Sequence, residues 1–471
     1  MRKFDTKIQY LKYKVLREVA RYGFEDNLDA AYYEIPKLIV KEKPTMRCCI
    51  YKERAIVEER IKLAMGGDKK NPNVIEVIEI ACDECPVSGH VVTESCRGCL
   101  AHRCEDVCRR GAITFDEQQK AHIDKSKCVE CGQCAKVCPY SAIINQKRPC
   151  EKACKIKAIS MSSEEHRAAH IDNEKCISCG ACVYQCPFGA IVDKSFILDA
   201  VNLIKRSHEN QDYKVYAVVA PSISSQFSYA KLGQVITGIQ RLGFYHVIEA
   251  ALGADMVAYK EAAELAEKGF LTSSCCPAFV EYVRNEFPML ADKVSDTPSP
   301  MVMTGRAIKA KDPEAIVVFI GPCIAKKYER KTEKAEPYID HVLTFMELQA
   351  LFDSTDIDIE DVEELDLQDA SCYGRGFAQS GGVTAAIVEA LKELGHADFA
   401  FKPVIANGVE ECRAALLKAK AGRLDGNFIE GMICAGGCVR GNGTMVNKKN
   451  TPMHMQQYCE ASTRKSLQNT K

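Results

Sequence analysis

Apolar residues recur three to four positions apart at the start of the chain. The stretches YLKYKVLREVARY and YKERAIVEERIKLAMG each place them on one side of a helix. The spacing predicts a helical N-terminal region over residues 1–80. Its first 25 residues are too densely charged for a secretory signal, and no apolar run is long enough to cross a bilayer. We expect a cytoplasmic protein without membrane insertion.

The pattern changes in the second half of the chain. A helix-like stretch, FILDAVNLIKRSHENQDY, leads into apolar strands (VYAVVAP, AIVVFIGP, FIEGMICAGG) that alternate with helical segments such as MVAYKEAAELAEKG and VTAAIVEALKELG. This alternation predicts an α/β domain over residues 208–460, with largely parallel sheets flanked by helices. Ligands of such folds gather at the carboxyl ends of strands. The acidic stretch 353–369 is expected to be an exposed connection.

Cysteine is the outlier of the composition. The chain has 26 cysteines among 471 residues, and residues 82–187 hold sixteen of them among short, turn-like segments. Disulfide scaffolds are small secreted chains, so metal binding at ligand spacings is the better interpretation. The formal net charge of −1 gives no field that would attract nucleic acid.

Two runs match the bacterial ferredoxin pattern C-x2-C-x2-C-x3-C-P. They are Cys128, Cys131, Cys134, Cys138 and Cys176, Cys179, Cys182, Cys186, each followed by proline. Three thiolates on one tight loop hold three corners of a [4Fe–4S] cubane, and the fourth cysteine reaches the neighbouring cluster. A structural zinc site normally uses paired C-x2-C knuckles instead. The runs predict at least two clusters in an α+β ferredoxin-like domain over residues 81–200.

Further half-motifs are incomplete. Cys96, Cys99, Cys104 and Cys108 have a longer middle gap and no proline (half-motif 96–108), Cys150 and Cys154 form a C-x3-C tail (150–154), and Cys82 and Cys85 form a C-x2-C pair. Together with the runs 128–138 and 176–186 they make sixteen cysteines, enough for four clusters that exchange their fourth ligands, as in polyferredoxins. Cys82 and Cys85 would then supply, from far upstream, the missing C-x2-C pair of the third half-motif along the chain, 150–154. The alternative is two or three clusters, with the remaining thiols free or on zinc.

Three motifs in the second half carry more cysteines at strand-to-loop junctions: TSSCCPAFVEYV, GPCIAKKYE and FIEGMICAGGCVRGNG. They resemble, in order, the three signature sequences of [FeFe]-hydrogenases. The resemblance implies an H-cluster between two lobes, a cubane joined to a diiron unit with CO, cyanide and a bridging dithiolate. It implies Cys276, Cys323, Cys434 and Cys438 as cubane ligands. Lys326 and Pro221 with Ser222 would hold the cyanides, while Phe377 and Met432 would pack against the diiron unit.

A proton path is also implied by the resemblance. The positions that match the family relay are Glu264, Ser295, Glu261 and Cys275. Glu261 and Glu264 lie three apart and share a helical face; taken alone they are no more than solvated carboxylates. The chain departs from the best-known members at Ser273 and Ser274, Phe279, Gly321, Met301 and the NGTM ending. These neighbours of the metal tune potentials and hydrogen bonds, which indicates a divergent subgroup.

The expected function is reversible reduction of protons to H2, with electrons relayed through the N-terminal clusters. A non-catalytic relative that acts in redox sensing or cluster assembly is the main alternative, and a pure polyferredoxin leaves the second half unexplained. No G-x-G-x-x-G follows a strand, so the expected partners are a soluble ferredoxin or another redox subunit, together with diiron maturation proteins. The remaining cysteines are expected to be free or buried thiols: Cys48, Cys49, Cys372, Cys412 and Cys459.

Overall fold

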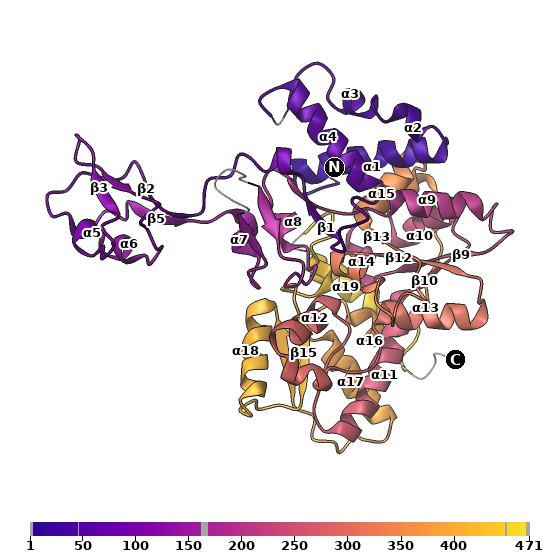
Figure 1. Ribbon diagram of the computed structural model, residues 1–471. Coiled ribbons are helices and arrows are strands. Elements are labelled where there is room, and N and C mark those ends of the chain that lie inside the picture. The colour runs from indigo at the N-terminus through magenta and orange to yellow at the C-terminus, as the bar shows by residue number, and fades with distance from the viewer. Residues whose placement is uncertain (1–2, 46, 162–167, 448–449, 468–471) are drawn as a thin grey trace.

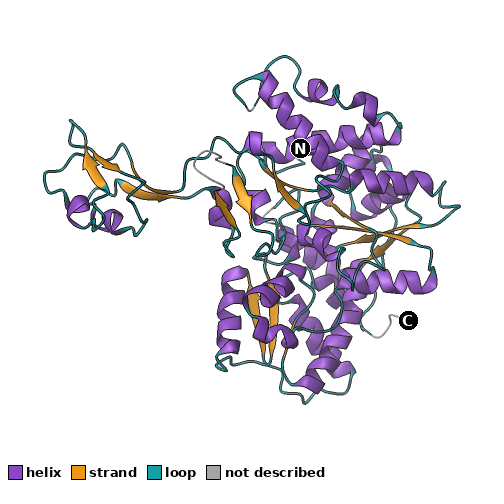
Figure 2. Ribbon diagram, viewed as in Figure 1, coloured by secondary structure: helices purple, strands orange, loops and turns teal. Residues whose placement is uncertain are grey.

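The computed structural model describes residues 3–45, 47–161, 168–447 and 450–467. N-terminal helices cover one side of an α/β body, and a slender arm of short strands and helices projects from that body (Figure 1). The arm consists of short strands, short helices and loops, whereas helices make up most of the body (Figure 2). No helix in the described part of the chain is long and apolar enough to span a membrane.

Four helices form the N-terminal region: α1 (Lys7–Phe24), α2 (Leu28–Ala31), α3 (Ile35–Ile39) and α4 (Ile50–Ala64). A capping box starts α1, because the Thr6 hydroxyl accepts from the Gln9 amide and the Gln9 side chain accepts from the Thr6 amide. The apolar face of α1 packs on α9 (Ile197–Arg206) and α15 (Phe345–Ser354). Val15 and Val19 therefore share one core with the body. The Gln9 side chain also donates to the Thr444 carbonyl at 3.0 Å, 435 positions away.

The helix predicted over 196–213 is shorter in the structure. It begins at Ile197 and ends at Arg206. His208, Glu209 and Asn210 adopt φ angles of 47°, 56° and 64°, the left-handed conformation that ends a helix.

The arm contains two modules with the same plan. The distal module, residues 89–146, contains the antiparallel pairs β2 (Gly89–Val92) with β5 (Ile143–Gln146) and β3 (Ile113–Phe115) with β4 (Ala121–Ile123), plus helices α5 (Arg103–Asp106) and α6 (Gln133–Val137). The proximal module, residues 75–85 and 149–193, contains β1 (Ile75–Val77) paired with β8 (Ile191–Asp193), β6 (Ile159–Met161) paired with β7 (Ala169–Ile171), α7 (Pro149–Ala153) and α8 (Ala181–Gln185). The distal module is thus an insertion within the proximal one.

The first lobe of the body is built on a four-stranded parallel sheet in the order β10-β9-β12-β13. Its strands are β9 (Val215–Val219), β10 (His246–Glu249), β12 (Ile316–Gly321) and β13 (His341–Thr344). Helices α10 (Leu232–Arg241), α13 (Pro300–Lys311) and α15 accompany it. The near-continuous apolar strands VYAVV and IVVFIG are buried, as expected for a parallel sheet covered on both faces.

The second lobe has a three-stranded parallel sheet in the order β11-β15-β14. Its strands are β11 (Leu271–Thr272), β14 (Pro403–Asn407) and β15 (Phe428–Met432), with helices α11 (Ala250–Lys268), α12 (Pro277–Glu286), α17 (Gly382–Glu393) and α18 (Val409–Lys420). The predicted parallel α/β architecture is confirmed. The acidic stretch 353–369 begins in the last two residues of α15 and is then irregular apart from η4 (Ile359–Asp361). Much of it is exposed, as expected, although Ile359 and Leu367 are buried.

Candidate functional site

The cysteines of the three body motifs meet where strands of both lobes end. Cys276 lies between β11 and α12, and Cys323 lies between β12 and α14 (Ile324–Glu329). Cys434 follows β15, and Cys438 begins η5 (Cys438–Arg440). Burial, followed by the charges of Cys323 and Cys276, raises the pKa of Cys438 to about 12. Burial also raises the pKa of Cys434, with further effects from the other three thiols. Effects of this kind need short distances, so the four thiols, called here the body group, lie together.

The loop between Cys434 and Cys438 depends on glycine. Gly436 and Gly437 have φ angles of 90° and 85°, which side chains rarely adopt. A Cβ at Gly437 would lie 2.7 Å from the Ala378 carbonyl oxygen. The CAGGC sequence therefore lets this loop approach the segment that carries Phe377.

Lys326 and Ser222 contribute polar groups near the body group. The Lys326 ammonium is 8% exposed and donates to Glu329 at 2.6 Å, Ser299 at 2.8 Å and the Cys275 carbonyl at 3.4 Å. Ser222 follows Pro221 in η2 (Pro221–Ser225), and its buried hydroxyl has no hydrogen-bond partner among the described residues. An orphaned buried hydroxyl is costly unless a ligand satisfies it.

An apolar cluster closes the same region. Phe377 and Met432 are 6% and 3% exposed and belong to one cluster, against which Cys275 packs. Buried thiols stay protonated and inert unless a metal displaces the proton, and thiolates are the ligands that iron–sulfur clusters require. The donor set, the buried cation and the orphaned hydroxyl together fit a cubane with an anionic appendage.

The predicted proton path is spatially continuous. The Ser295 hydroxyl donates to Glu264 at 2.6 Å, and the Glu264 side chain is 13% exposed beside Lys268. Ser295 also lies close enough to Glu261 to lower its pKa, although burial dominates and raises that pKa to about 7. Burial, followed by the charge of Glu261, raises the pKa of Cys275 well above its usual range. The chain Glu264, Ser295, Glu261, Cys275 thus leads from the surface to the body group.

Ser274 joins this path, although the sequence presented it only as a departure from the family pattern. Its amide and its hydroxyl each lie 2.9 Å from Glu261 Oε1. Glu261 Oε2 has no partner in the part of the chain that the structure describes. In the sequence, the only indication of a role for Ser274 is that it precedes Cys275. That position does not reveal which carboxylate the serine binds.

The other departures are packing features. Phe279 is fully buried, and a Cβ at Gly431 would lie 2.3 Å from its ring. The Ser273 hydroxyl accepts from the Gly431 amide at 3.1 Å. Met301 is 1% exposed, and Gly321 lies against the Phe319 ring.

The distal module brings eight thiols into two groups. One cavity is lined by Cys108 of the first run and by three cysteines of the second, here named the Cys131 group: Cys108, Cys128, Cys131 and Cys134. Cys96, Cys104 and Cys138 belong to one apolar cluster. The pKa of Cys104 is raised by burial and then by the charges of Cys99 and Cys138, which places Cys99 near them. These form the Cys99 group: Cys96, Cys99, Cys104 and Cys138. Each group takes three cysteines from one run and the fourth from the other.

The proximal module repeats this exchange across the inserted distal module. One small cavity is lined by the Cys186 group: Cys82, Cys85, Cys150 and Cys186. The remaining four form the Cys179 group: Cys154, Cys176, Cys179 and Cys182. Burial raises the pKa of Cys182 well above its usual range, with further effects from the other three. Cys82 and Cys85 thus complete the half-motif 150–154 from upstream.

The spacing of these thiols bears on the metal. Among the described residues, no three His, Cys, Asp or Glu side chains lie close enough to hold a single metal ion. Four cysteines line each of two cavities in the arm, and four thiolates are the ligand set of a cubane.

Asn442 connects the proximal module to the body group. Its side-chain amide donates to the Cys179 carbonyl at 2.8 Å and lies 3.7 Å from Cys434 Sγ. The two loops approach closely, because a Cβ at Gly180 would lie 2.4 Å from Ile324 Cδ1. The sequence showed Asn442 only as part of an unusual ending to the third motif.

The other cysteines stand apart from these groups. Cys412 is buried and contacts the carbonyl oxygens of Ala406 and Met432. Cys49 accepts the Lys52 amide at the start of α4, and Cys48 is exposed. Burial, followed by the charge of Cys372, raises the pKa of Cys459 to about 11.

The fold and these thiol groups define a class: an iron–sulfur protein in which a ferredoxin-like arm joins a two-lobed α/β body. Residues 213–442 match the family described as iron only hydrogenase large subunit, C-terminal domain. Residues 95–142 match a 4Fe-4S dicluster domain, and residues 169–192 match a 4Fe-4S binding domain. The second half of the chain is therefore similar to this hydrogenase domain family, and the region before it matches iron–sulfur domain families.

Several known proteins are similar to this chain. Iron hydrogenase 1 of Clostridium pasteurianum is 27% identical over 295 residues, which is 51% of each chain, so the match spans about half of that relative. The periplasmic [Fe] hydrogenase large subunit of Nitratidesulfovibrio vulgaris is 27% identical over 70% of this chain and 87% of its own. The cytosolic Fe-S cluster assembly factor NAR1 of Eremothecium gossypii is 33% identical over 28% of this chain and 31% of its own. A structure of a variant of the [FeFe]-hydrogenase HydA1 from Chlamydomonas reinhardtii superposes with a TM-score of 0.48 at 19% identity, covering 57% of this chain and 91% of that one.

Proposed function

We propose that the protein is a cytoplasmic iron hydrogenase that catalyses 2H⁺ + 2e⁻ ⇌ H2. The observation that carries this proposal is the continuous path from Glu264 through Ser295 and Glu261 to Cys275. A protein that only held clusters would need the body group but no buried carboxylate with a free oxygen beside a spare thiol. Burying such a carboxylate destabilises the fold, so its presence favours a catalytic role.

The residues of the site have distinct tasks in this proposal. The body group would hold a cubane, with Cys438 shared with a diiron unit, and Lys326 and Ser222 would donate to its anionic ligands. Phe377 and Met432 would exclude water. When bound, the clusters would supply one-electron transfer and the diiron unit an open site for protons and H2. Cys275, Glu261, Ser295 and Glu264 would hold and pass protons between this site and solvent.

The arm would hold four further [4Fe–4S] clusters, one in each thiol group. Its distal end is the expected contact for a soluble ferredoxin or another redox subunit. Diiron maturation proteins are the second class of partner that the proposal requires.

The test is infrared spectroscopy of the full chain produced with and without diiron maturation proteins, combined with hydrogen evolution from a reduced dye. Bands of iron-bound CO and cyanide, together with H2, are expected only after maturation. A matured protein that binds cubane iron but shows neither band refutes the proposal.

Cluster assembly or redox sensing is the second candidate. The similarity to the cytosolic Fe-S cluster assembly factor NAR1, at 33% identity over 142 residues, supports it. In that case the infrared bands are absent and Glu261→Gln leaves the function of the protein in the cell unchanged.

A further inference from the structure

Arg60, on α4, is a buried cation without a carboxylate partner. It is 3% exposed, and its Nη2 donates to the Gly189 carbonyl at 2.8 Å and, at 3.5 Å, to that of Phe188. Its Nε and Nη1 have no hydrogen-bond partner within the described residues. A buried charge is costly unless an opposite charge lies nearby.

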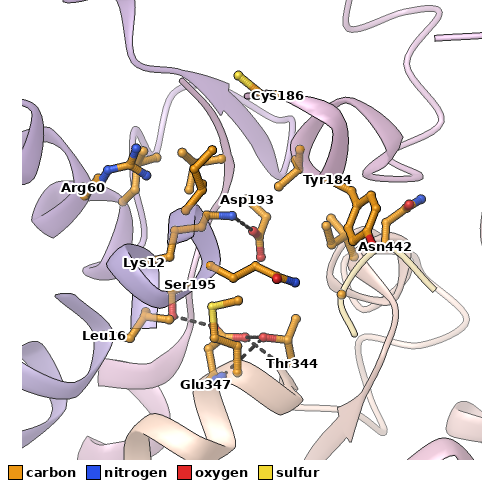
Figure 3. Close-up of a pocket in the computed structure, with 18 of the residues that line it drawn as sticks. Lys12, Leu16, Arg60, Tyr184, Cys186, Asp193, Ser195, Thr344, Glu347 and Asn442 are labelled. Atoms are coloured by element: carbon orange, nitrogen blue, oxygen red, sulfur yellow. Dashed lines mark hydrogen bonds and ion pairs between the residues drawn. The ribbon is translucent and has the colours of Figure 1, made fainter. Parts of the chain in front are cut away.

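The cavity beside Arg60 offers no free carboxylate. Its volume is about 280 Å³, and it lies where α1, α4, α8 and α15 meet (Figure 3). Two carboxylates are found among the described residues that line it. Asp193 pairs with Lys12 at 3.2 Å and Lys327 at 2.8 Å, and Glu347 pairs with Lys327 at 3.0 Å.

One group of opposite charge remains close to Arg60. Arg60 and Cys186 border the same cavity, and the carbonyls that Arg60 contacts belong to residues two and three positions after Cys186. Burial lowers the pKa of Arg60 to about 10, against a raising effect of the Cys186 thiolate, so the guanidinium stays charged at neutral pH. Cys186 also lines the small cavity of the Cys186 group.

From this arrangement we infer that Arg60 is the fixed counter-charge of the cluster in the Cys186 group and raises its reduction potential. The inference rests on the proposed function, in which that group holds a cubane. A cubane with four thiolates is anionic and gains a further negative charge on reduction, so a buried cation nearby stabilises the reduced form. Arg60 is a positioning residue, since it acts on the metal through Cys186 and the backbone that follows.

The arrangement also links the N-terminal helices to the arm. Arg60 brings its charge from α4 to a loop of the proximal module, so the helical region supplies part of the cluster's surroundings. Within the described part of the chain, Arg60 makes its hydrogen bonds to the proximal module and none to the distal module, so the two distal clusters would keep their own potentials.

The test is a potentiometric titration of the full chain with reconstituted cubanes, followed by electron paramagnetic resonance. Arg60→Met and Arg60→Gln should move one reduction step to lower potential and leave the others in place. Arg60→Lys, which keeps the charge, should stay near the native value. Cys85→Ala identifies the step, because that variant lacks one thiol of the Cys186 group.

Lys62→Met is the matched control. It removes a charge from the same helix, but Lys62 is exposed and paired with Glu59, so no step should move. The inference is overturned if no reduction step moves in Arg60→Met and Arg60→Gln. It is also overturned if Arg60→Lys and Arg60→Met lose iron equally, because Arg60 would then contribute packing and not charge. A native chain with far fewer than about twenty irons, five cubanes' worth, would instead contradict the cluster assignment itself.

Discussion

Glu261 is fully buried and lies beside the partly buried Cys275, and the surroundings of both groups raise their pKa values. The carboxyl has a pKa of about 7 because it is removed from water, and the thiol is kept neutral by the same burial and by the nearby carboxylate. A carboxyl group with a pKa near neutrality can both take up and release a proton at ordinary pH, which suits Glu261 to proton transfer.

Cys275→Ala is expected to keep every cluster and lose most turnover. The thiol is not part of the body group, so iron content and cubane spectra should match the native protein. Loss of a positioned proton carrier costs roughly 100-fold or more in rate. Hydrogen evolution and iron analysis on the same preparation measure both effects, and native turnover in this variant would remove the proton-transfer assignment.

Glu261→Gln should become more stable relative to the native protein as pH rises. The folded-state pKa of about 7 lies above the ordinary 4.5, so the folded protein holds this proton more tightly. The stability linked to it is present below about pH 4.5 and is lost as pH rises through about 7. The melting temperature of Glu261→Gln should exceed that of the native protein by more at pH 8 than at pH 6. Glu267→Gln, at an exposed position on the same helix, should show no such trend.

At the scale of elements, the helices and strands are joined by buried charge networks. Lys327 on α14 is fully buried and pairs with Asp193 at the end of β8 and with Glu347 on α15. Glu347 also accepts from Ser195, which lies between β8 and α9. This network fixes the proximal module against the first lobe, and so holds the Cys179 group beside Cys434.

Lys327→Met is expected to destabilise the protein by roughly 3–5 kcal/mol, because two buried carboxylates lose their shared partner. Chemical unfolding of the reconstituted chain measures this loss. Lys334→Met, at an exposed position ten residues before Thr344, should change stability by less than about 0.5 kcal/mol. Equal stabilities of the two variants would show that the network does not hold the module.

The sequence predicted elements better than their contacts. Apolar runs such as VYAVV predicted the buried parallel strands, because burial on both faces leaves a direct signature. Amphipathic spacing predicted α1 but could not show that its apolar face packs on α15. The spacing identifies which side of a helix is apolar, but it does not identify the element that this side contacts. Arg60 and Asn442 could not have been selected, because a single polar residue has no periodicity and its role depends on chain segments more than 100 positions away.

For the whole molecule, the nested arm is the main architectural feature. Cysteine spacing predicted the two complete runs, and the count of sixteen suggested that Cys82 and Cys85 complete the half-motif 150–154. Spacing could not show which thiols share a cavity, since the exchange depends on how the two modules fold back on themselves.

Excision of residues 89–146 should remove two clusters and leave the rest. Gly89 and Gln146 are paired neighbours in the β2–β5 ladder, so Ser88 and Lys147 can be joined by two glycines without moving the proximal module. Iron content should fall by about eight, two cubanes' worth. Loss of all accessory iron would show that the Cys186 group needs the distal module to form.

The bond from Gln9 to Thr444 has a consequence for biosynthesis. At the usual speed of translation, the partner of this glutamine leaves the ribosome on the order of a minute after the first helix does. Until then α1 lacks that carbonyl, even though α15 has already been synthesised, so the contact between α1 and the loop that follows Cys438 cannot form. The last stage of synthesis therefore provides a period in which assembly factors can reach the loop that follows Cys438 before the amino-terminal helix binds to it.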